Sequence, residues 1–248
     1  MSRARRSLLR SALVGILPAA VMTGVAGAFL THRLGLGVAY PEKALAVFAA
    51  GAALVLWRLP KHHPFGAFGA ANQVTVSRGA LVALLAALIG ERTGAGVPLF
   101  ATAAAVTVAV LDGVDGWLAR RQRMASDFGA RFDMETDALF ILVLAVLAWQ
   151  FDKTAAWVVL SGVFRYAFVG AGMVVPWLRR PLPHSARRKI IAVVQVVALI
   201  VTLAPFVPPA MAARVAAVGL CALTASFAVD ILWLYHNGAR SRTTVSQS

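Results

Sequence analysis

Four aspartates in one short segment are the residues whose types and spacing could do chemistry. Asp112 and Asp115 are three residues apart, and Asp133 and Asp137 are four apart. Residues at these spacings share a helix face, so each pair can point at one spot. Their hard oxygen ligands select Mg²⁺, Mn²⁺ or Ca²⁺ over metals that prefer sulfur. The segment therefore predicts a divalent-cation site, and two ions there would clamp a phosphate during its displacement.

The composition of the whole chain indicates where this acidic segment lies. Of the 248 residues, 60% are hydrophobic, and the mean hydropathy is +0.76, far above that of an ordinary soluble domain. Carboxylates at membrane depth cost roughly 3 kcal/mol each unless they are paired, hydrated or bound to cations. We therefore expect an integral membrane protein whose aspartates lie at the edge of the bilayer and require cations there.

Eight apolar stretches have about the length of 20 residues that a membrane helix needs. They lie at about 12–30, 43–58, 73–90, 96–116, 131–150, 154–177, 189–207 and 210–234. The predicted fold class is therefore all-α, a polytopic integral membrane protein. Two prolines and two glycines between Leu59 and Gly69 interrupt any helix there. This break divides the chain into an N-terminal extension of two helices (1–70), a six-helix core (71–240) and a short tail (241–248).

The net charge of +14 predicts the orientation in the membrane. Short cytoplasmic loops carry the excess of Lys and Arg. The basic segments at 3–10, 58–78, 120–123, 179–189 and 240–242 all fall on one side of the eight-span arrangement. Both termini and the acidic segment are therefore expected on the cytoplasmic side, in the inner membrane of the cell. Because these bases sit between apolar spans, nucleic acid is not an expected partner.

Small residues continue the faces on which the aspartates lie. Gly116 follows Asp112 by four residues, Ala119 comes three further on, and Gly129 precedes Asp133 by four. Positions with little or no side chain let a bulky ligand approach the backbone. Close packing of membrane helices through small residues is the alternative interpretation.

Together these residues resemble the signature of the CDP-alcohol phosphotransferase family. The sequence reads Asp112-x-x-Asp115-Gly116-x-x-Ala119-Arg120, eight further residues, then Gly129-x-x-x-Asp133-x-x-x-Asp137, which matches all eight defining positions. The resemblance implies a six-helix catalytic core preceded here by two extra transmembrane helices. It also implies a transferase of phospholipid biosynthesis, which moves a phosphatidyl group from a CDP-linked donor such as CDP-diacylglycerol to an alcohol and releases CMP.

The same resemblance implies a role for each position of the motif. Asp112, Asp115 and Asp133 would be metal ligands, and Asp137 would be both a ligand and the general base for the acceptor hydroxyl. The positions that would accommodate CDP are Gly116, Ala119, Arg120 and Gly129. The expected cofactor is Mg²⁺ or Mn²⁺, as two ions. A homodimer is a further expectation, and membrane lipids are expected partners.

A second polar stretch opens the first helix of the core. Asn72, Thr75 and Arg78 are spaced by three and share a face, resembling an Asn-x-x-Thr-x-x-Arg stretch of the same family. The resemblance implies that Asn72 and Thr75 bind CDP. Helix capping by Asn72 with interfacial snorkelling of Arg78 is the alternative interpretation.

Three basic residues are candidates for binding the acceptor. Arg165 lies within an apolar span, where an arginine is a functional candidate by default. Arg188 and Lys189 directly precede the next span, although anchoring to the membrane surface explains the same two bases. The sequence leaves the alcohol open among glycerol 3-phosphate, inositol phosphate, serine, choline and others.

Two other functions compete with the transferase. A divalent-cation transporter could use the same aspartates, but it needs acidic residues spread along a pathway through the bilayer. An inactive scaffold would not need four costly anions. The clustering of all four aspartates at one edge favours the enzyme over both.

Overall fold

The computed structural model describes residues 3–62, 65–121, 126–180, 182–183 and 185–245. Within them the chain forms eight α-helices and two short 3₁₀ helices, without strands. The helices are α1 (Arg3–Leu34), α2 (Tyr40–His62), α3 (Ala70–Ala87), α4 (Val97–Arg121), α5 (Asp127–Gln150), α6 (Leu160–Val174), α7 (Ala186–Leu203) and α8 (Pro209–Val245), with η1 (Ala156–Val159) before α6 and η2 (Pro176–Arg179) after it. The predicted all-α class is confirmed, and each of the eight apolar stretches corresponds to one α-helix.

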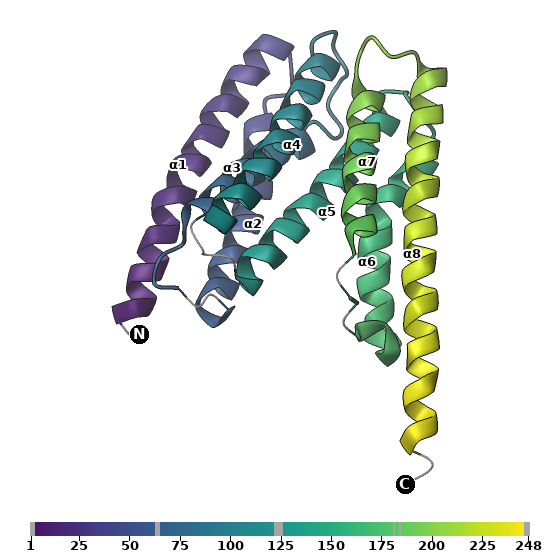
Figure 1. Cartoon of the computed structure of the whole chain (residues 1–248). Coiled ribbons are helices and arrows are strands. Elements are labelled where there is room, and N and C mark those ends of the chain that lie inside the picture. The colour runs from purple at the N-terminus through teal and green to yellow at the C-terminus, as the bar shows by residue number, and fades with distance from the viewer. Residues whose placement is uncertain (1–2, 63–64, 122–125, 181, 184, 246–248) are drawn as a thin grey trace.

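The helices form two groups joined by α5. In Figure 1, α1 to α4 lie together, α6 to α8 lie together, and α5 runs obliquely between the groups. Accordingly, α5 packs against α2 and α3 on one side and against α6 and α7 on the other. Helix α1 begins and α8 ends at the same end of the bundle, as an even number of crossings requires.

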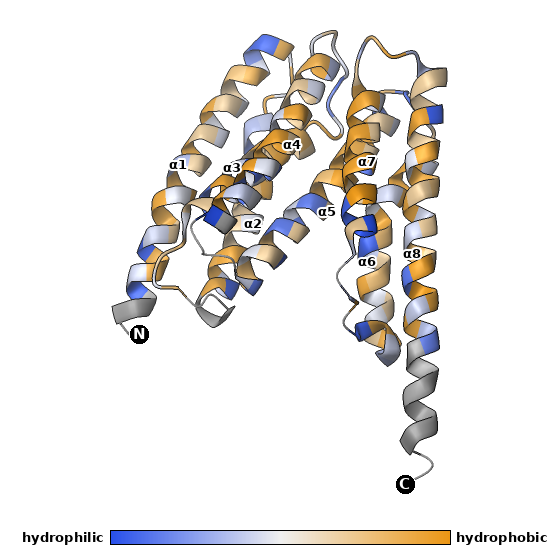
Figure 2. Cartoon of the chain, viewed as in Figure 1, coloured by the Kyte–Doolittle hydropathy of each residue, from blue (hydrophilic) through white to orange (hydrophobic). Residues whose placement is uncertain are grey.

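The hydropathy of the helices is that of a membrane protein. Four of them are by themselves long and apolar enough to cross a membrane among the described residues: Arg6–Leu34, Val97–Leu118, Ala156–Val174 and Pro209–His236. The polar residues of the candidate site lie on α3 and α5, which are outside this set, and on the last turns of α4, which is within it. Figure 2 shows hydrophilic residues along one half of α5 and hydrophobic residues along the other.

Two hydrogen bonds fix the first two helices to the core. The Ser11 hydroxyl of α1 accepts a hydrogen bond from the Phe68 backbone N–H at 2.9 Å, just before α3 begins. The buried Tyr40 hydroxyl, at the start of α2, donates to the Leu84 carbonyl of α3 at 2.8 Å. Gly69 is the N-cap of α3 with φ of 84°, a conformation that favours glycine. The entry of the chain into α3 at Phe68 and Gly69 is thus fixed.

Gly162 sets how closely α6 approaches α5. A Cβ atom added to Gly162 would overlap the Cα and Cβ of Leu142 in α5. Because Cα belongs to the backbone, rotation of a side chain cannot relieve this overlap. Only glycine allows this approach, which is the small-residue packing typical of membrane helices.

We expect Gly162→Ala to lower the free energy of unfolding by about 1–3 kcal/mol, because α5 and α6 must move apart. Gly170→Ala in the same helix is the matched control, since a Cβ there meets nothing within 4 Å. Thermal unfolding in detergent measures both variants. Equal unfolding temperatures would show that the α5–α6 approach tolerates a methyl group.

Glu91 ties together the loops at the opposite end of the helices. Its carboxylate accepts a hydrogen bond from the Gly37 backbone N–H at 2.7 Å and forms an ion pair with Lys43 at 2.5 Å. The Lys43 hydrogen bond is the main cause that lowers the pKa of Glu91 below its ordinary value. The residue thereby joins the loop after α3 to the connection between α1 and α2.

The stabilisation by Glu91 therefore depends on pH. It is complete above the pKa of this glutamate in the unfolded chain and is lost as the pH falls through its lower pKa in the folded state. Glu91→Gln should cost about 1–2 kcal/mol of unfolding free energy near neutral pH. The difference in unfolding temperature between the two proteins should shrink towards zero in acid. A difference that stays constant with pH would contradict a role for the charge.

Candidate active site

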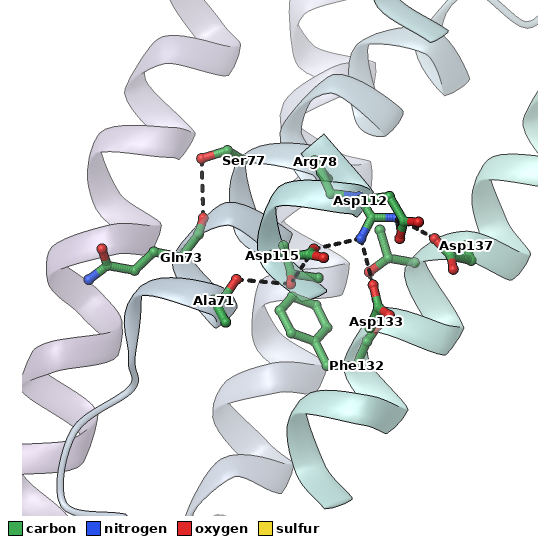
Figure 3. A network of polar contacts seen from close by, with 11 residues as sticks. Ala71, Gln73, Ser77, Arg78, Asp112, Asp115, Phe132, Asp133 and Asp137 are labelled. Atoms are coloured by element: carbon green, nitrogen blue, oxygen red, sulfur yellow. Dashed lines mark hydrogen bonds and ion pairs between the residues drawn. The ribbon is translucent and has the colours of Figure 1, made fainter. Parts of the chain in front are cut away.

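The centre of the site is the side chain of Arg78, which is only 1% exposed. Its Nη1 donates to Asp115 at 2.7 Å and to Asp133 at 2.5 Å. Its Nη2 lies 2.9 Å from a carboxylate oxygen of Asp112 and also donates to Asp137. Figure 3 shows the guanidinium surrounded by these carboxylates. One arginine therefore joins the four aspartates of the motif, which we call the aspartate cluster.

The arrangement of three helices explains why the aspartates converge. Asp112 and Asp115 lie in the last turns of α4, and Asp133 and Asp137 lie in the first turns of α5. Helix α3 packs against both α4 and α5, so a side chain of α3 can reach the two pairs. The start of α5 is fixed by Ser126, whose hydroxyl accepts a hydrogen bond from the Gly129 N–H at 3.1 Å.

The four aspartates do not have equal environments. The Asp115 side chain is 5% exposed, and it accepts a hydrogen bond from Thr75 at 3.1 Å besides the one from Arg78. The side chains of Asp112, Asp133 and Asp137 are 41%, 39% and 40% exposed. Because Asp115 is buried and accepts hydrogen bonds from Arg78 and Thr75, it has a structural role in addition to its predicted role as a metal ligand.

Three of the carboxylates could hold a metal ion together. Asp112, Asp133 and Asp137 each offer an oxygen, and these atoms lie within 4.8 Å of one another. The donor set consists of hard oxygens that solvent can reach, which fits Mg²⁺ or Mn²⁺. Three of the four predicted metal ligands are thus brought together, and the fourth, Asp115, is joined to them through its ion pair with Arg78.

Asn72 and Gly129, near the beginnings of α3 and α5, lie close to each other. Asn72 donates to the Phe68 carbonyl at 2.5 Å, and Gly69 rather than Asn72 is the N-cap of α3. A Cβ on Gly129 would lie 3.1 Å from the Asn72 amide oxygen, closer than nearly all such contacts. The alternative interpretation of capping and snorkelling is wrong, because Asn72 does not cap the helix and Arg78 is buried.

The remaining predicted CDP positions lie at the end of α4. Gly116 is partly buried on this helix, next to Asp115. Ala119 and Arg120 belong to the last turn, but their side chains lie outside the described residues. A contact of Arg120 with phosphate therefore stays a prediction from the sequence.

The basic residues predicted to bind the acceptor have other partners. Arg165 of α6 pairs with Glu135 of α5 at 2.5 Å. Arg188 lies 3.3 Å from Asp230 and donates to the Pro183 carbonyl, whereas Lys189 is exposed. In the part of the chain that is described, none of the three forms an ion pair with the aspartate cluster. Their predicted role is therefore less directly supported by the geometry than that of the aspartates.

Two ion-pair partners were given no role by the sequence. Glu135 pairs with Arg165, and Asp230 accepts hydrogen bonds from Arg187 at 2.5 Å and from Arg188. The central position of Arg78 was also missed, although its spacing from Thr75 and Asn72 placed it on the polar face of α3. That shared face was the one signal that pointed to it.

The fold and the cluster define a polytopic membrane protein with a polar, acidic site between helix ends. The sequence model of the family described as CDP-alcohol phosphatidyltransferase matches residues 68–229, from just before α3 into α8. The chain belongs to the CDP-alcohol phosphatidyltransferase family. No curated protein and no solved structure matches it. Membership implies a phosphotransferase that acts on a CDP-linked substrate, in a family that generally uses divalent metals.

Removal of the Arg78 side chain tests its structural role. We expect Arg78→Ala to lower the free energy of unfolding by about 3 kcal/mol or more, because Asp115 keeps its burial and loses its cation. Arg78→Lys should lose less, since a point charge replaces part of the bidentate contacts. Ser77→Ala, at the exposed neighbouring position, is the control. An Arg78→Ala protein that unfolds at the wild-type temperature would contradict this role.

Proposed function

We propose that the protein is a membrane transferase that depends on Mg²⁺ or Mn²⁺. It moves a phosphatidyl group from a CDP-linked lipid such as CDP-diacylglycerol to an alcohol and releases CMP, as a step of phospholipid biosynthesis. The observation that carries the proposal is the convergence of Asp112, Asp133 and Asp137 within 4.8 Å, inside the segment that matches the family. A site for hard cations is what transfer from a pyrophosphate requires.

Each aspartate has a distinct role in this proposal. Asp112, Asp115, Asp133 and Asp137 hold the cations, which when bound would neutralise charge on the pyrophosphate and on the departing CMP. Asp115, fixed by Arg78 and Thr75, also keeps the end of α4 in register with α3. Asp137 also accepts the proton of the acceptor hydroxyl as general base. The hydrogen bond from Arg78 orients the Asp137 carboxylate towards the other three aspartates.

The nucleotide lies beside the aspartate cluster on the small-residue positions. Gly116, Ala119 and Gly129 leave room for the CDP group, and Asn72 and Thr75 line its α3 side. The short distance from Asn72 to the place that a Cβ of residue 129 would occupy supports this, since a side chain there would close the space between α3 and α5. Arg120 contributes contacts to phosphate oxygens, for which a guanidinium is well suited.

The acceptor and the setting in the membrane complete the proposal. Arg165, Arg188 and Lys189 contribute to the acceptor side, and a phosphorylated alcohol matches their charge. Both termini and the site face the cytoplasm from the inner membrane, because the basic segments lie at this end. The division into an extension (1–70), a catalytic core (71–240) and a tail (241–248) and a homodimeric assembly belong to the same proposal.

An assay of CMP release tests this function. Purified protein with CDP-diacylglycerol, Mg²⁺ or Mn²⁺ and a set of alcohols should release CMP with one preferred acceptor. Asp137→Asn should lower kcat by roughly 10²–10⁴, the contribution of a general base. Asp127→Asn, exposed in the first turn of α5 and outside the motif, should retain activity.

Two results would overturn the proposal. CMP release by Asp137→Asn at the wild-type rate would remove the base from the assigned mechanism. Failure of every alcohol to support CMP release, together with uptake of Mn²⁺ into proteoliposomes without nucleotide, would instead establish the transporter that uses the same aspartates. The assay thus separates the two functions with a single preparation.

A further inference from the structure

A cavity with a volume of about 430 Å³ lies between α1, α2, α3 and α5. Its walls are mainly apolar, and they include Ile16 of α1, Val47, Phe48 and Val55 of α2, and Leu139 of α5. The volume is within the range of roughly 300–1,000 Å³ that is usual for small-molecule sites. Walls of this apolar character favour a hydrocarbon ligand.

The cavity lies next to the aspartate cluster on neighbouring faces of the same helices. Gly79, which lines it, follows Arg78 directly in α3. Phe132 and Thr136, which also line it, directly precede Asp133 and Asp137 in α5. Each of these three lining residues is adjacent in sequence to Arg78 or to an aspartate of the cluster. A ligand in the cavity would therefore lie close to the candidate site.

The lining of the cavity runs along α2 from a charged residue to apolar ones. Arg58 lines it near the end of this helix, and Glu135 and Tyr166 are further polar residues of the lining. Val47 and Phe48 lie three turns earlier on α2, about 16 Å away along the axis at the usual rise of a helix. A charged group at one end of a long apolar space matches the headgroup and chain of a lipid.

Two glycines keep the cavity open. A Cβ atom on Gly51 of α2 or on Gly79 of α3 would meet nothing within 4 Å. Both residues line the cavity, and no neighbouring helix packs closely enough on either glycine to exclude a larger side chain. Gly51 precedes the family match at residues 68–229, which means that this wall comes from the extension. The hydrogen bonds of Ser11 and Tyr40 hold α1 and α2 in position for it.

We infer that this cavity binds one acyl chain of the lipid donor, and that α2 is the wall that sets the chain length it accepts. The inference rests on the proposed function for the identity of the donor. It assigns to the N-terminal extension a part in substrate selection, because without α2 one side of the chain would face bulk lipid.

The test fills the cavity from α2. Gly51→Phe places a ring in the open space, and Ala53→Phe, exposed on α2 and outside the lining of the cavity, is the matched control. CMP release is measured with CDP-dioleoylglycerol and with CDP-dioctanoylglycerol. Gly51→Phe should raise the KM for the long-chain donor about tenfold, as expected when two methylenes lose their contacts. The short-chain KM, kcat and the control should stay unchanged.

A binding measurement keeps the inference independent of turnover. Each donor shifts the unfolding temperature of the protein it binds. The wild type should be stabilised more by the long-chain donor than by the short-chain one, and Gly51→Phe should remove that difference. If the wild type releases no CMP but shows this difference, the transferase proposal fails and the acyl-chain site stands.

Three outcomes would overturn the acyl-chain site. One is an unchanged long-chain KM in Gly51→Phe. The second is an equal rise in KM for both donors, which would place the effect on the headgroup. The third is a wild type that both donors stabilise equally. If Gly51→Phe does not fold, Gly51→Leu makes the same comparison with a smaller side chain.

Discussion

The structure depends on one buried guanidinium that holds four carboxylates from two helices. Arg78 is 1% exposed, and the aspartates around it come from α4 and α5. A single positive charge cannot balance four negative charges, so the cluster keeps an excess of negative charge. Holding that excess at membrane depth is costly, and bound cations are one means by which a membrane protein offsets it. The group of carboxylates that could hold a divalent ion is thus assembled by the same interaction that joins the three helices.

The rest of the bundle supports this interaction from several sides. Gly162 lets α6 pack closely on α5, and Ser126 fixes where α5 begins. Glu91 in the loop after α3 pairs with Lys43 of α2, and Ser11 binds the Phe68 N–H just before α3, so that α3 is held at both ends. The side chain of Arg78 therefore reaches the aspartates from a helix with little freedom to shift. A guanidinium is suited to this position because its planar fork serves several acceptors at once.

Sequence spacing predicted the helices and the acidic residues of the site, but not which aspartate is buried and which are exposed. A period of three or four residues assigns Asp115 and Asp112 to one face, yet it does not say which of them is buried. That outcome depends on Thr75 and Arg78, which lie on another helix. Similarly, the apolar context identified Arg165 as unusual, whereas its pairing with Glu135 depends on how α6 crosses α5.

The position of the cluster also explains what the N-terminal helices add. Arg78 and Gly79 are neighbours on α3, so the face beside the guanidinium opens onto the cavity that α2 closes. The aspartate cluster and the apolar cavity therefore share the backbone of α3 and α5 and lie on adjacent faces of these helices. The proposed substrate, with a charged nucleotide and an apolar chain, has this same division, so two adjacent helix faces would serve both of its parts.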